Sequence, residues 1–335
     1  MTDVPVSHDH EPQRHRITEK FNLCVFVSLW FVIVGAGLWA QQPPSSIPVL
    51  PVQGNVSMLW GAESNVAIQT GPDGVLLVDT QPAAAAANVF AAVRGLSKEP
   101  IHTIINTHLH ADHTGGTGAL VKMRGAGPQS VRVMAHENVL ARMQKATAAG
   151  APPSAELRIN AVINLPVTST YFEPTRDFHL NGEAVVLYHV PAAHTDGDTL
   201  VHFRKSDVVA TGDVFTPDLY PIIDLQNGGS VNGLIAALNT ILEITVPARY
   251  QEGGTYVIPG RGRLCDEADV VEYRDMVAII RDRVQELMAK KLTLEQVKAA
   301  RPTRDYDTEY GAATGPWTTD MFVEAVYRSL GASRK

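Results

Sequence analysis

The segment from residue 106 to residue 116, Asn-Thr-His-Leu-His-Ala-Asp-His-Thr-Gly-Gly, constrains this chain more than any other stretch. Three histidines and one aspartate fall within six residues, directly after an apolar run, Ile101–Ile105, that predicts a buried strand. In extended or tightly turned backbone, residues two apart point the same way. His108 and His110 can therefore reach one metal ion together.

The other two ligand-type side chains of this motif, Asp112 and His113, fall on a turn and suit a second metal beside the first. Imidazole and carboxylate groups are ligands of Zn(II), and also of Fe and Mn. Solvated loop histidines are the alternative, but the pattern His-x-His-x-Asp-His after a strand is much more specific than isolated histidines. The sequence therefore predicts a metal centre at the end of this strand.

The composition is that of a globular enzyme with ample core: 335 residues, of which 45% are hydrophobic and 19% charged. The net charge of −7 argues against a nucleic-acid partner, which would favour a basic face, and leaves a small-molecule substrate. Of the two cysteines, Cys24 lies in an N-terminal segment of different character, so no disulfide framework is expected. Cys265 is expected to be a small buried apolar residue.

Residues 1–40 read as a targeting segment rather than as part of the fold. Three basic residues at positions 14–20 precede a nearly unbroken apolar stretch, 21–40, and a polar, proline-rich linker follows at 41–48. This order is that of a secretory signal peptide, and the stretch is also long enough to be an uncleaved membrane anchor. Either interpretation places the remaining chain in the periplasm or outside the cell, touching a membrane only through this segment.

The rest of the chain alternates strand and helix patterns. Turn signals at 72–74 (Pro-Asp-Gly) and 181–182 (Asn-Gly) each join two predicted strands into a hairpin. Hairpins followed by strand–helix units predict an α/β fold, a four-layer αββα sandwich, over residues 49–290. Residues 291–335 are expected to form a C-terminal helical extension, in which 305–315 reads as an exposed loop.

Further candidate ligands follow other predicted strands. His194 lies in a polar loop, Asp213 follows Thr-Gly at the end of a strand, and Pro259-Gly260 ends the last strand. Loops at one edge of a sheet are where sites are built. Together with the motif at 107–116, this ordered set resembles the metallo-β-lactamase superfamily over about residues 50–290. The first motif is specific, whereas the others gain weight from their order.

The resemblance implies the metallo-β-lactamase fold and one or two Zn(II) ions. The ligands that it implies are His108, His110 and His194 for the first ion, Asp112 and His113 for the second, and Asp213 for both. Asp79 would orient the histidine loop, while Asp198 is expected to hold its own loop by hydrogen bonds. Two cations that share a water can lower its pKa and polarise a substrate carbonyl for attack by hydroxide. Asp213 on both ions and Asp112 as a proton acceptor would complete the catalytic set.

One position departs from the family pattern. The residue after the Pro-Gly loop is commonly a histidine ligand of the second metal, and here it is Arg261. A guanidinium group has no lone pair to offer, so we predict a weaker second site or activity with a single metal. Arg261 would pair with Asp112, bind a substrate carboxylate, or point to solvent.

Three functions are compatible with these residues. The leading one is an exported zinc-dependent hydrolase of an activated acyl compound: a β-lactam, lactone, thioester or ester. Because a fold does not determine the substrate, the sequence does not identify which of these bonds is hydrolysed. The second is an iron-dependent, sulfur-oxidising dioxygenase, which needs fewer second-site ligands; the third is a non-catalytic binding protein, against which the intact ligand set argues. The long loop 215–229 offers Tyr220, Asp224 and Asn227 as substrate contacts.

Overall fold

The computed structural model describes residues 47–124, 130–148 and 166–332 of the chain. Residues 1–40, for which the sequence predicts a signal peptide or a membrane anchor, lie outside the described residues. Within the described part, no helix combines the length and the apolar character needed to cross a bilayer.

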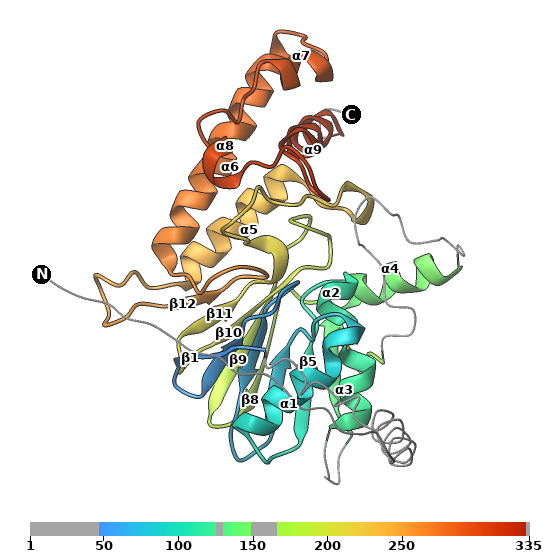
Figure 1. Ribbon diagram of the computed structural model, residues 1–335, viewed down its shortest axis with the longest axis vertical. Helices are drawn as coiled ribbons and strands as arrows, with labels where there is room; N and C mark the ends of the chain where they lie inside the picture. The colour runs from blue at the N-terminus through green and yellow to red at the C-terminus, as the bar shows by residue number, and fades with distance from the viewer. Residues whose placement is uncertain (1–46, 125–129, 149–165, 333–335) are drawn as a thin grey trace, which may run out of the picture. The chain divides into compact units, whose positions relative to one another are not determined.

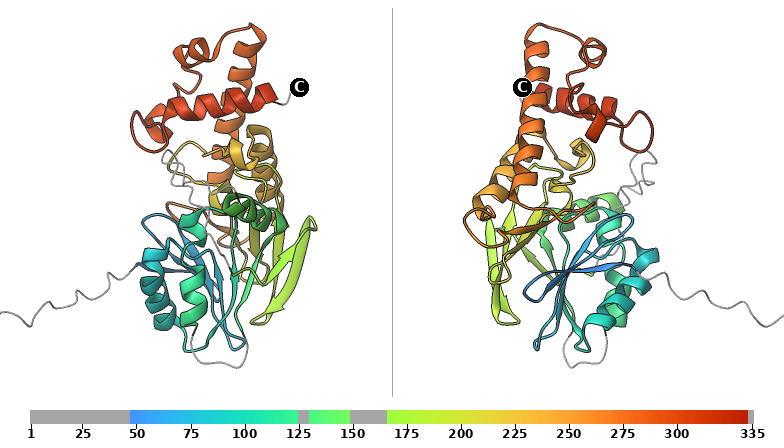
Figure 2. Two further views of the ribbon diagram at one scale, coloured as in Figure 1. Left: turned by 90° about the vertical axis from the view of Figure 1, so that its right-hand side faces the viewer. Right: turned by 60° about the vertical axis from the view of Figure 1, so that its left-hand side comes forward.

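Two β-sheets face each other, with helices on their outer faces (Figures 1 and 2). The strands of the first sheet are β1 (Val49–Gln53), β2 (Val56–Leu59), β3 (Val66–Gln69), β4 (Val75–Val78), β5 (Ile101–Ile105), β6 (Arg132–His136) and β7 (Ser169–Tyr171). They lie in chain order, antiparallel as far as β4 and parallel from β4 to β7. The strands of the second sheet are β8 (Thr175–Leu180), β9 (Glu183–His189), β10 (Thr199–Phe203), β11 (Val208–Ala210) and β12 (Tyr256–Ile258). Their order is β12-β11-β10-β9-β8, in which β11 and β12 form the parallel pair.

The helices are distributed over both halves of the chain. The α-helices are α1 (Ala86–Leu96), α2 (Ala111–Thr114), α3 (Thr117–Met123), α4 (Glu137–Ala148), α5 (Val231–Ile244), α6 (Glu267–Ala289), α7 (Leu294–Ala299), α8 (Asp307–Tyr310) and α9 (Thr319–Ala332). Short 3-10 turns are η1 (Ala83–Ala85), η2 (Gly212–Val214) and η3 (Leu225–Asn227). The caps explain where the long helices begin: Ser230 accepts the Gly233 N–H at the start of α5, and Asp266 forms a capping box with Asp269 at α6.

The apolar side chains sort into layers because the strands are buried on both faces. Leu76 and Val78 of β4 point toward the second sheet, whereas Leu77 points toward α1 and α3. On the outer face of the second sheet, Leu200 and Val257 pack with α5, α6 and α9. Strands buried on both faces read as continuous apolar runs in the sequence. The predicted αββα sandwich is confirmed.

Loops from both sheets meet at one end of the sandwich and are tied together by backbone hydrogen bonds. The Asn65 N–H donates to the Gly260 carbonyl (2.8 Å), and the Gly260 N–H donates to the Gly212 carbonyl (2.9 Å). The Thr199 N–H donates to the Thr107 carbonyl (2.9 Å). These bonds satisfy loop backbone groups that burial would otherwise leave unpaired, and they fix the relative positions of the loops.

One local expectation is wrong. The segment 305–315 is not simply an exposed loop, because it contains α8 and because Tyr310 is buried against Tyr220. In addition, strand β7 was not predicted, since its three residues are too short for a periodic signal.

His202 on β10 generates a prediction about pH. Burial lowers its pKa to about 4, helped by Arg204 and opposed by Asp207 and Glu183. The unfolded chain binds this proton near pH 6.5, so the contribution to stability is complete above that pH and is lost as the pH falls from 6.5 toward 4. We expect this residue to lower the free energy of unfolding by about 1–2 kcal/mol between pH 7 and pH 5.

Urea unfolding of His202→Phe at the two pH values should show a smaller difference than the natural chain by that amount. His179→Phe, a matched change at an exposed histidine of β8, should keep the original difference. An unchanged pH dependence in His202→Phe would contradict the prediction.

Candidate metal centre

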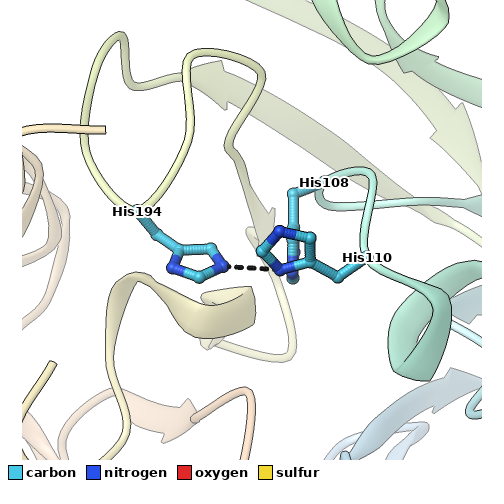
Figure 3. A group of neighbouring side chains, drawn as sticks. All are labelled: His108, His110 and His194. Carbon is cyan, nitrogen blue, oxygen red and sulfur yellow. Dashed lines mark hydrogen bonds between the residues drawn. The ribbon is translucent and has the colours of Figure 1, made fainter. Parts of the chain in front are cut away.

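Three histidines from two distant segments converge at the end of the sandwich where the loops meet (Figure 3). His108 and His110 lie between β5 and α2, and His194 lies in the loop after β9. The ring centroids are 4.7 Å apart in each of the three pairs. All three side chains are buried. The structure thus brings together the three residues expected at the first metal.

Each of these rings is held at one nitrogen and leaves the other facing the cluster. The holding contacts join His110 Nε2 to Asp224 Oδ2 (3.0 Å), His194 Nδ1 to the Ile222 carbonyl (2.7 Å) and His108 Nδ1 to Thr107 Oγ1 (3.0 Å). The remaining nitrogens are His108 Nε2, His110 Nδ1 and His194 Nε2, and the last two lie within hydrogen-bond distance of each other, 3.0 Å (Figure 3). Among the described residues, His108 Nε2 is buried without a hydrogen-bond partner. Rings fixed from behind in this way are what metal-binding histidines require, so these residues fit a cation.

The protonation states agree with this interpretation. Burial lowers the pKa of His108 well below its ordinary value, and the neighbouring rings of His113, His110 and His194 lower it further. Burial also lowers the pKa of His110. Only a neutral imidazole can be a metal ligand, and these two are held in that form.

A second cluster lies beside the first. His113 Nε2 is 3.0 Å from Asp213 Oδ1 and 3.4 Å from Asp112 Oδ2, and His108, His113 and Asp213 form a second group able to hold a metal ion. Burial opposes protonation of His113, but Asp213, Asp112 and Asp79 raise its pKa well above the ordinary value. The field that favours a proton on this ring also favours a cation near it. The clusters therefore lie as in a dinuclear site.

Arg261 already supplies a cation to the second cluster. Its Nη2 contacts Asp112 Oδ2 and lies 3.2 Å from Asp213 Oδ2, its Nε is also 3.2 Å from Asp213 Oδ2, and its Nη1 donates to the Glu63 carbonyl. Burial opposes these charges, yet Arg261 holds the pKa of Asp213 well below its ordinary value. Of the three possibilities for Arg261, pairing with Asp112 is the one observed, and Asp213 shares it. A Cβ on the preceding residue, Gly260, would collide with Asp213, so the backbone there packs directly against this carboxylate.

Asp79 and Asp198 behave as expected for supporting residues. Asp79 accepts hydrogen bonds from the Thr107 N–H (2.8 Å) and Oγ1 (2.7 Å), and its Oδ2 also lies 2.7 Å from His113 Nδ1. Its φ of 65° is uncommon for a residue other than glycine. Asp198 accepts the Thr195 N–H (2.8 Å) and so holds the turn that carries His194.

In the loop 215–229, the three residues expected to contact substrate, Tyr220, Asp224 and Asn227, are not among those that line the cavity described below, and Asp224 supports a histidine instead. Asp224 binds His110 and accepts the N–H groups of Gln226 and Asn227, which makes it the cap of η3. Burial would raise the pKa of Asp224, but the hydrogen bond from His110 lowers it to about 2. Tyr220 is directed to the C-terminal helices, where its hydroxyl donates to the Thr303 carbonyl. The supporting role of Asp224 was missed.

The ligand-type residues form one side of a cavity of about 330 Å³. His110, His194, Asp112, Asp213 and Arg261 line it on the polar side, and Leu219, Ile222, Ala312, Pro316 and Trp317 line it on the apolar side. A larger cavity, of about 570 Å³, lies at the opposite end of β5 near Ile101 and His102. We regard the smaller cavity as the functional one because the buried, metal-type side chains line it.

Asp224→Ala should weaken metal binding, because the His110 ring loses the acceptor that fixes its orientation. Loss of such a partner costs about 10–100-fold in metal affinity. Titration of the metal-free protein with Zn(II) against a chromophoric chelator measures this. Asp218→Ala, at an exposed aspartate of the same loop, is the control and should bind as the natural chain does. Equal affinity in both variants would show that Asp224 does not support His110.

Comparison with known proteins agrees with this geometry. The metallo-beta-lactamase superfamily matches residues 59–299. The α subunit of 2,4-dinitroanisole O-demethylase from Nocardioides sp. (strain JS1661) is 29% identical over 182 residues, which are 53% of this chain and 49% of that protein. The alkyl/aryl-sulfatase BDS1 of Saccharomyces cerevisiae is 20% identical over 334 residues, covering 88% of this chain and 51% of that protein. This chain thus spans about half the length of these relatives.

Solved structures show the same fold. The sec-alkylsulfatase Pisa1 from Pseudomonas sp. superimposes with a TM-score of 0.62 at 18% identity, over 84% of this chain and 50% of that one. A metallo-beta-lactamase from Pontibacter korlensis superimposes with a TM-score of 0.50 at 14% identity, over 69% of this chain and 98% of that one. With the match over residues 59–299 and the two His/Asp clusters in place, the chain belongs to the metallo-beta-lactamase superfamily, as its motifs predicted.

Proposed function

We propose that this protein is a zinc-dependent hydrolase that cleaves a small activated acyl compound: an ester, lactone, thioester or β-lactam. The observation that supports it most is the set of three buried imidazoles, each held at one nitrogen and facing the others, of which His110 and His194 line a cavity. Three histidines are a donor set of catalytic zinc sites, which leave one position for water or substrate. When bound, the metal supplies Lewis-acid chemistry, lowering the pKa of a water and polarising the scissile bond.

The chain's own residues supply the rest of the proposed site. Asp112 and Asp213 line the cavity next to the histidines, so they are the groups proposed to accept and return a proton. Arg261 contacts both carboxylates, offsets part of their charge and fixes their orientation. The apolar side of the cavity excludes bulk water from the reacting bond, which strengthens every electrostatic interaction there.

Two alternatives are weighed against specific observations. An iron-dependent, sulfur-oxidising dioxygenase would use two histidines and one carboxylate, a composition that His108, His113 and Asp213 share. It is disfavoured because Arg261 is already paired with Asp213, whereas the three-histidine cluster holds no competing cation. Hydrolysis of a sulfate ester or an aryl methyl ether is the second candidate, since the relatives are named as an alkyl/aryl-sulfatase and a 2,4-dinitroanisole O-demethylase. Hydrolysis of a sulfate ester or of an aryl methyl ether would use the same site as acyl hydrolysis and would differ from it in the bond that is broken.

The purified full chain tests this proposal. We expect zinc in it, and hydrolysis of one or more members of a panel comprising a chromogenic β-lactam, a lactone, a thioester, an aryl ester, an aryl sulfate and 2,4-dinitroanisole. His110→Ala should abolish turnover and keep the thermal unfolding midpoint within a few degrees. Bound iron with oxygen consumption on a sulfur substrate would contradict it, and a folded protein that binds metal but turns over no panel member would favour a binding role.

We further propose that the protein holds one metal ion tightly, at His108, His110 and His194. The support is Arg261, whose guanidinium contacts both carboxylates that a second ion would need. A second cation would have to displace a group that is attached to the chain and carries the same sign of charge. Buried carboxylates that are already paired gain little from an additional partner.

Arg261→His should create a tight second site, because it removes the competing cation and adds an imidazole. We expect the bound metal to rise from about one to about two ions per chain, measured by elemental analysis after dialysis. Arg263→His is the matched control, since Arg263 pairs with Asp269 on α6 and should leave the metal content unchanged. Two equally tight ions in the natural chain would refute the single-metal proposal.

A further inference from the structure

A closed loop in the C-terminal part of the chain forms part of the wall of the metal cavity. Its base is clasped by two hydrogen bonds, from the Ala312 N–H to Thr319 Oγ1 (3.1 Å) and from the Thr319 N–H to the Ala312 carbonyl (2.9 Å). We call residues 312–319 the clasped loop. Within it, Gly315 has a φ of 113°, a conformation that favours glycine, and Pro316 fixes the next backbone angle. Ala312, Pro316 and Trp317 line the cavity.

The flanks of the clasped loop are anchored to the segment that supports the metal histidines. Before the loop, the Tyr310 carbonyl accepts the Tyr220 N–H (3.3 Å), and the two rings lie 5.8 Å apart. After the loop, Phe322 of α9 stacks on Tyr220 at 4.7 Å with nearly parallel rings. Tyr220 belongs to the same loop as Ile222 and Asp224, which fix His194 and His110. The position of the wall is therefore coupled to the position of the histidines.

The two sides of the cavity differ in chemistry. The histidines, Asp112, Asp213 and Arg261 supply most of its polar lining, and its apolar lining comes from Leu219, Ile222 and three residues of the clasped loop, which also contributes Thr314. The volume of the cavity, about 330 Å³, is at the small end for ligand-binding cavities, so the cavity admits a compact group. Apolar area removed from water stabilises binding by about 25 cal/mol per Å², which favours an uncharged apolar group on this side.

We propose that the clasped loop, with Leu219 and Ile222, selects the substrate by receiving a compact apolar group, aryl or branched alkyl, next to the bond that is cleaved. This assignment rests on the hydrolase function proposed above and narrows it to small esters with an apolar substituent. Trp317 is the principal contact, because it offers the largest apolar surface of the wall. Its indole N–H is buried without a partner among the described residues, so its ring and its N–H are tested separately.

Binding to the cobalt-loaded full chain tests the wall without requiring turnover. The probes are 2-mercaptoethanol and benzyl mercaptan, whose binding as thiolates to Co(II) is followed by the charge-transfer absorption of the cobalt–sulfur bond. We expect benzyl mercaptan to bind about tenfold or more tightly than 2-mercaptoethanol, because only its ring reaches the apolar side. Trp317→Ala should lower this preference about tenfold by weakening benzyl mercaptan alone.

Three further variants make the result specific. Trp317→Phe keeps a ring and loses the N–H, so it should retain most of the preference. Trp60→Ala removes a tryptophan that is 52% exposed and should leave both affinities unchanged. If Trp317→Ala does not fold, Ala312→Leu replaces it: the added bulk in the same wall should weaken benzyl mercaptan and spare 2-mercaptoethanol.

The outcomes separate the two proposals. A preference that is absent in the natural chain, or unchanged in both Trp317→Ala and Ala312→Leu, overturns the role of the clasped loop and leaves the metal centre intact. A natural chain that retains no cobalt, and gives no cobalt–sulfur absorption with either thiol, overturns the metal-dependent hydrolase itself.

Discussion

The geometry of the centre depends on hydrogen bonds to the far side of each imidazole ring. Asp79, which follows β4, holds His113 and Thr107, and the adjacent pairing of β4 with β5 places it beside the histidine motif. Asp224 and the Ile222 carbonyl do the same for His110 and His194 from a loop far along the chain. An imidazole can face a shared cation only if its other nitrogen is satisfied, since an unpaired buried donor costs about 1–3 kcal/mol. The sheets position these partners, and the partners position the ligands.

Charge balance is the second constraint on the site. Asp112 and Asp213 are buried, and carboxylates removed from water require a cation or a set of donors. Arg261 supplies one positive charge to these two carboxylates from within the chain, so their charge is offset in part independently of metal supply. The histidine side carries no such charge, because burial keeps His108 and His110 neutral. The carboxylate cluster thus obtains positive charge from Arg261, whereas the histidine cluster would obtain it from a bound metal ion. His108 belongs to both clusters.

The sequence was sufficient to predict the site residues where the pattern lies within one short segment. The His-x-His-x-Asp-His spacing places four ligand-type side chains within six residues, and strand ends bring His194 and Asp213 to the same edge. It was insufficient where a role depends on distant packing. Asp224 was expected to contact substrate, and nothing in the neighbouring sequence indicates that one of its oxygens caps η3 while the other reaches His110. The sequence left three environments open for Arg261: Asp112, a substrate carboxylate or solvent. Its contact with Asp112 in the structure decides between them. The clasped loop has turn-like composition, and only the packing of Tyr310 and Phe322 around Tyr220 places it at the cavity.

Gly260 and Arg261 are adjacent in the chain but differ in how far the structure tolerates their substitution. A side chain at Gly260 would collide with Asp213, and its backbone is bonded to both Gly212 and Asn65, so this position admits no variation. Position 261 carries a side chain that reaches into the carboxylate cluster without being required by the fold. Arginine and histidine codons such as CGC and CAC differ by one base. The exchange that we propose to change the number of bound metal ions can therefore be a single-nucleotide step.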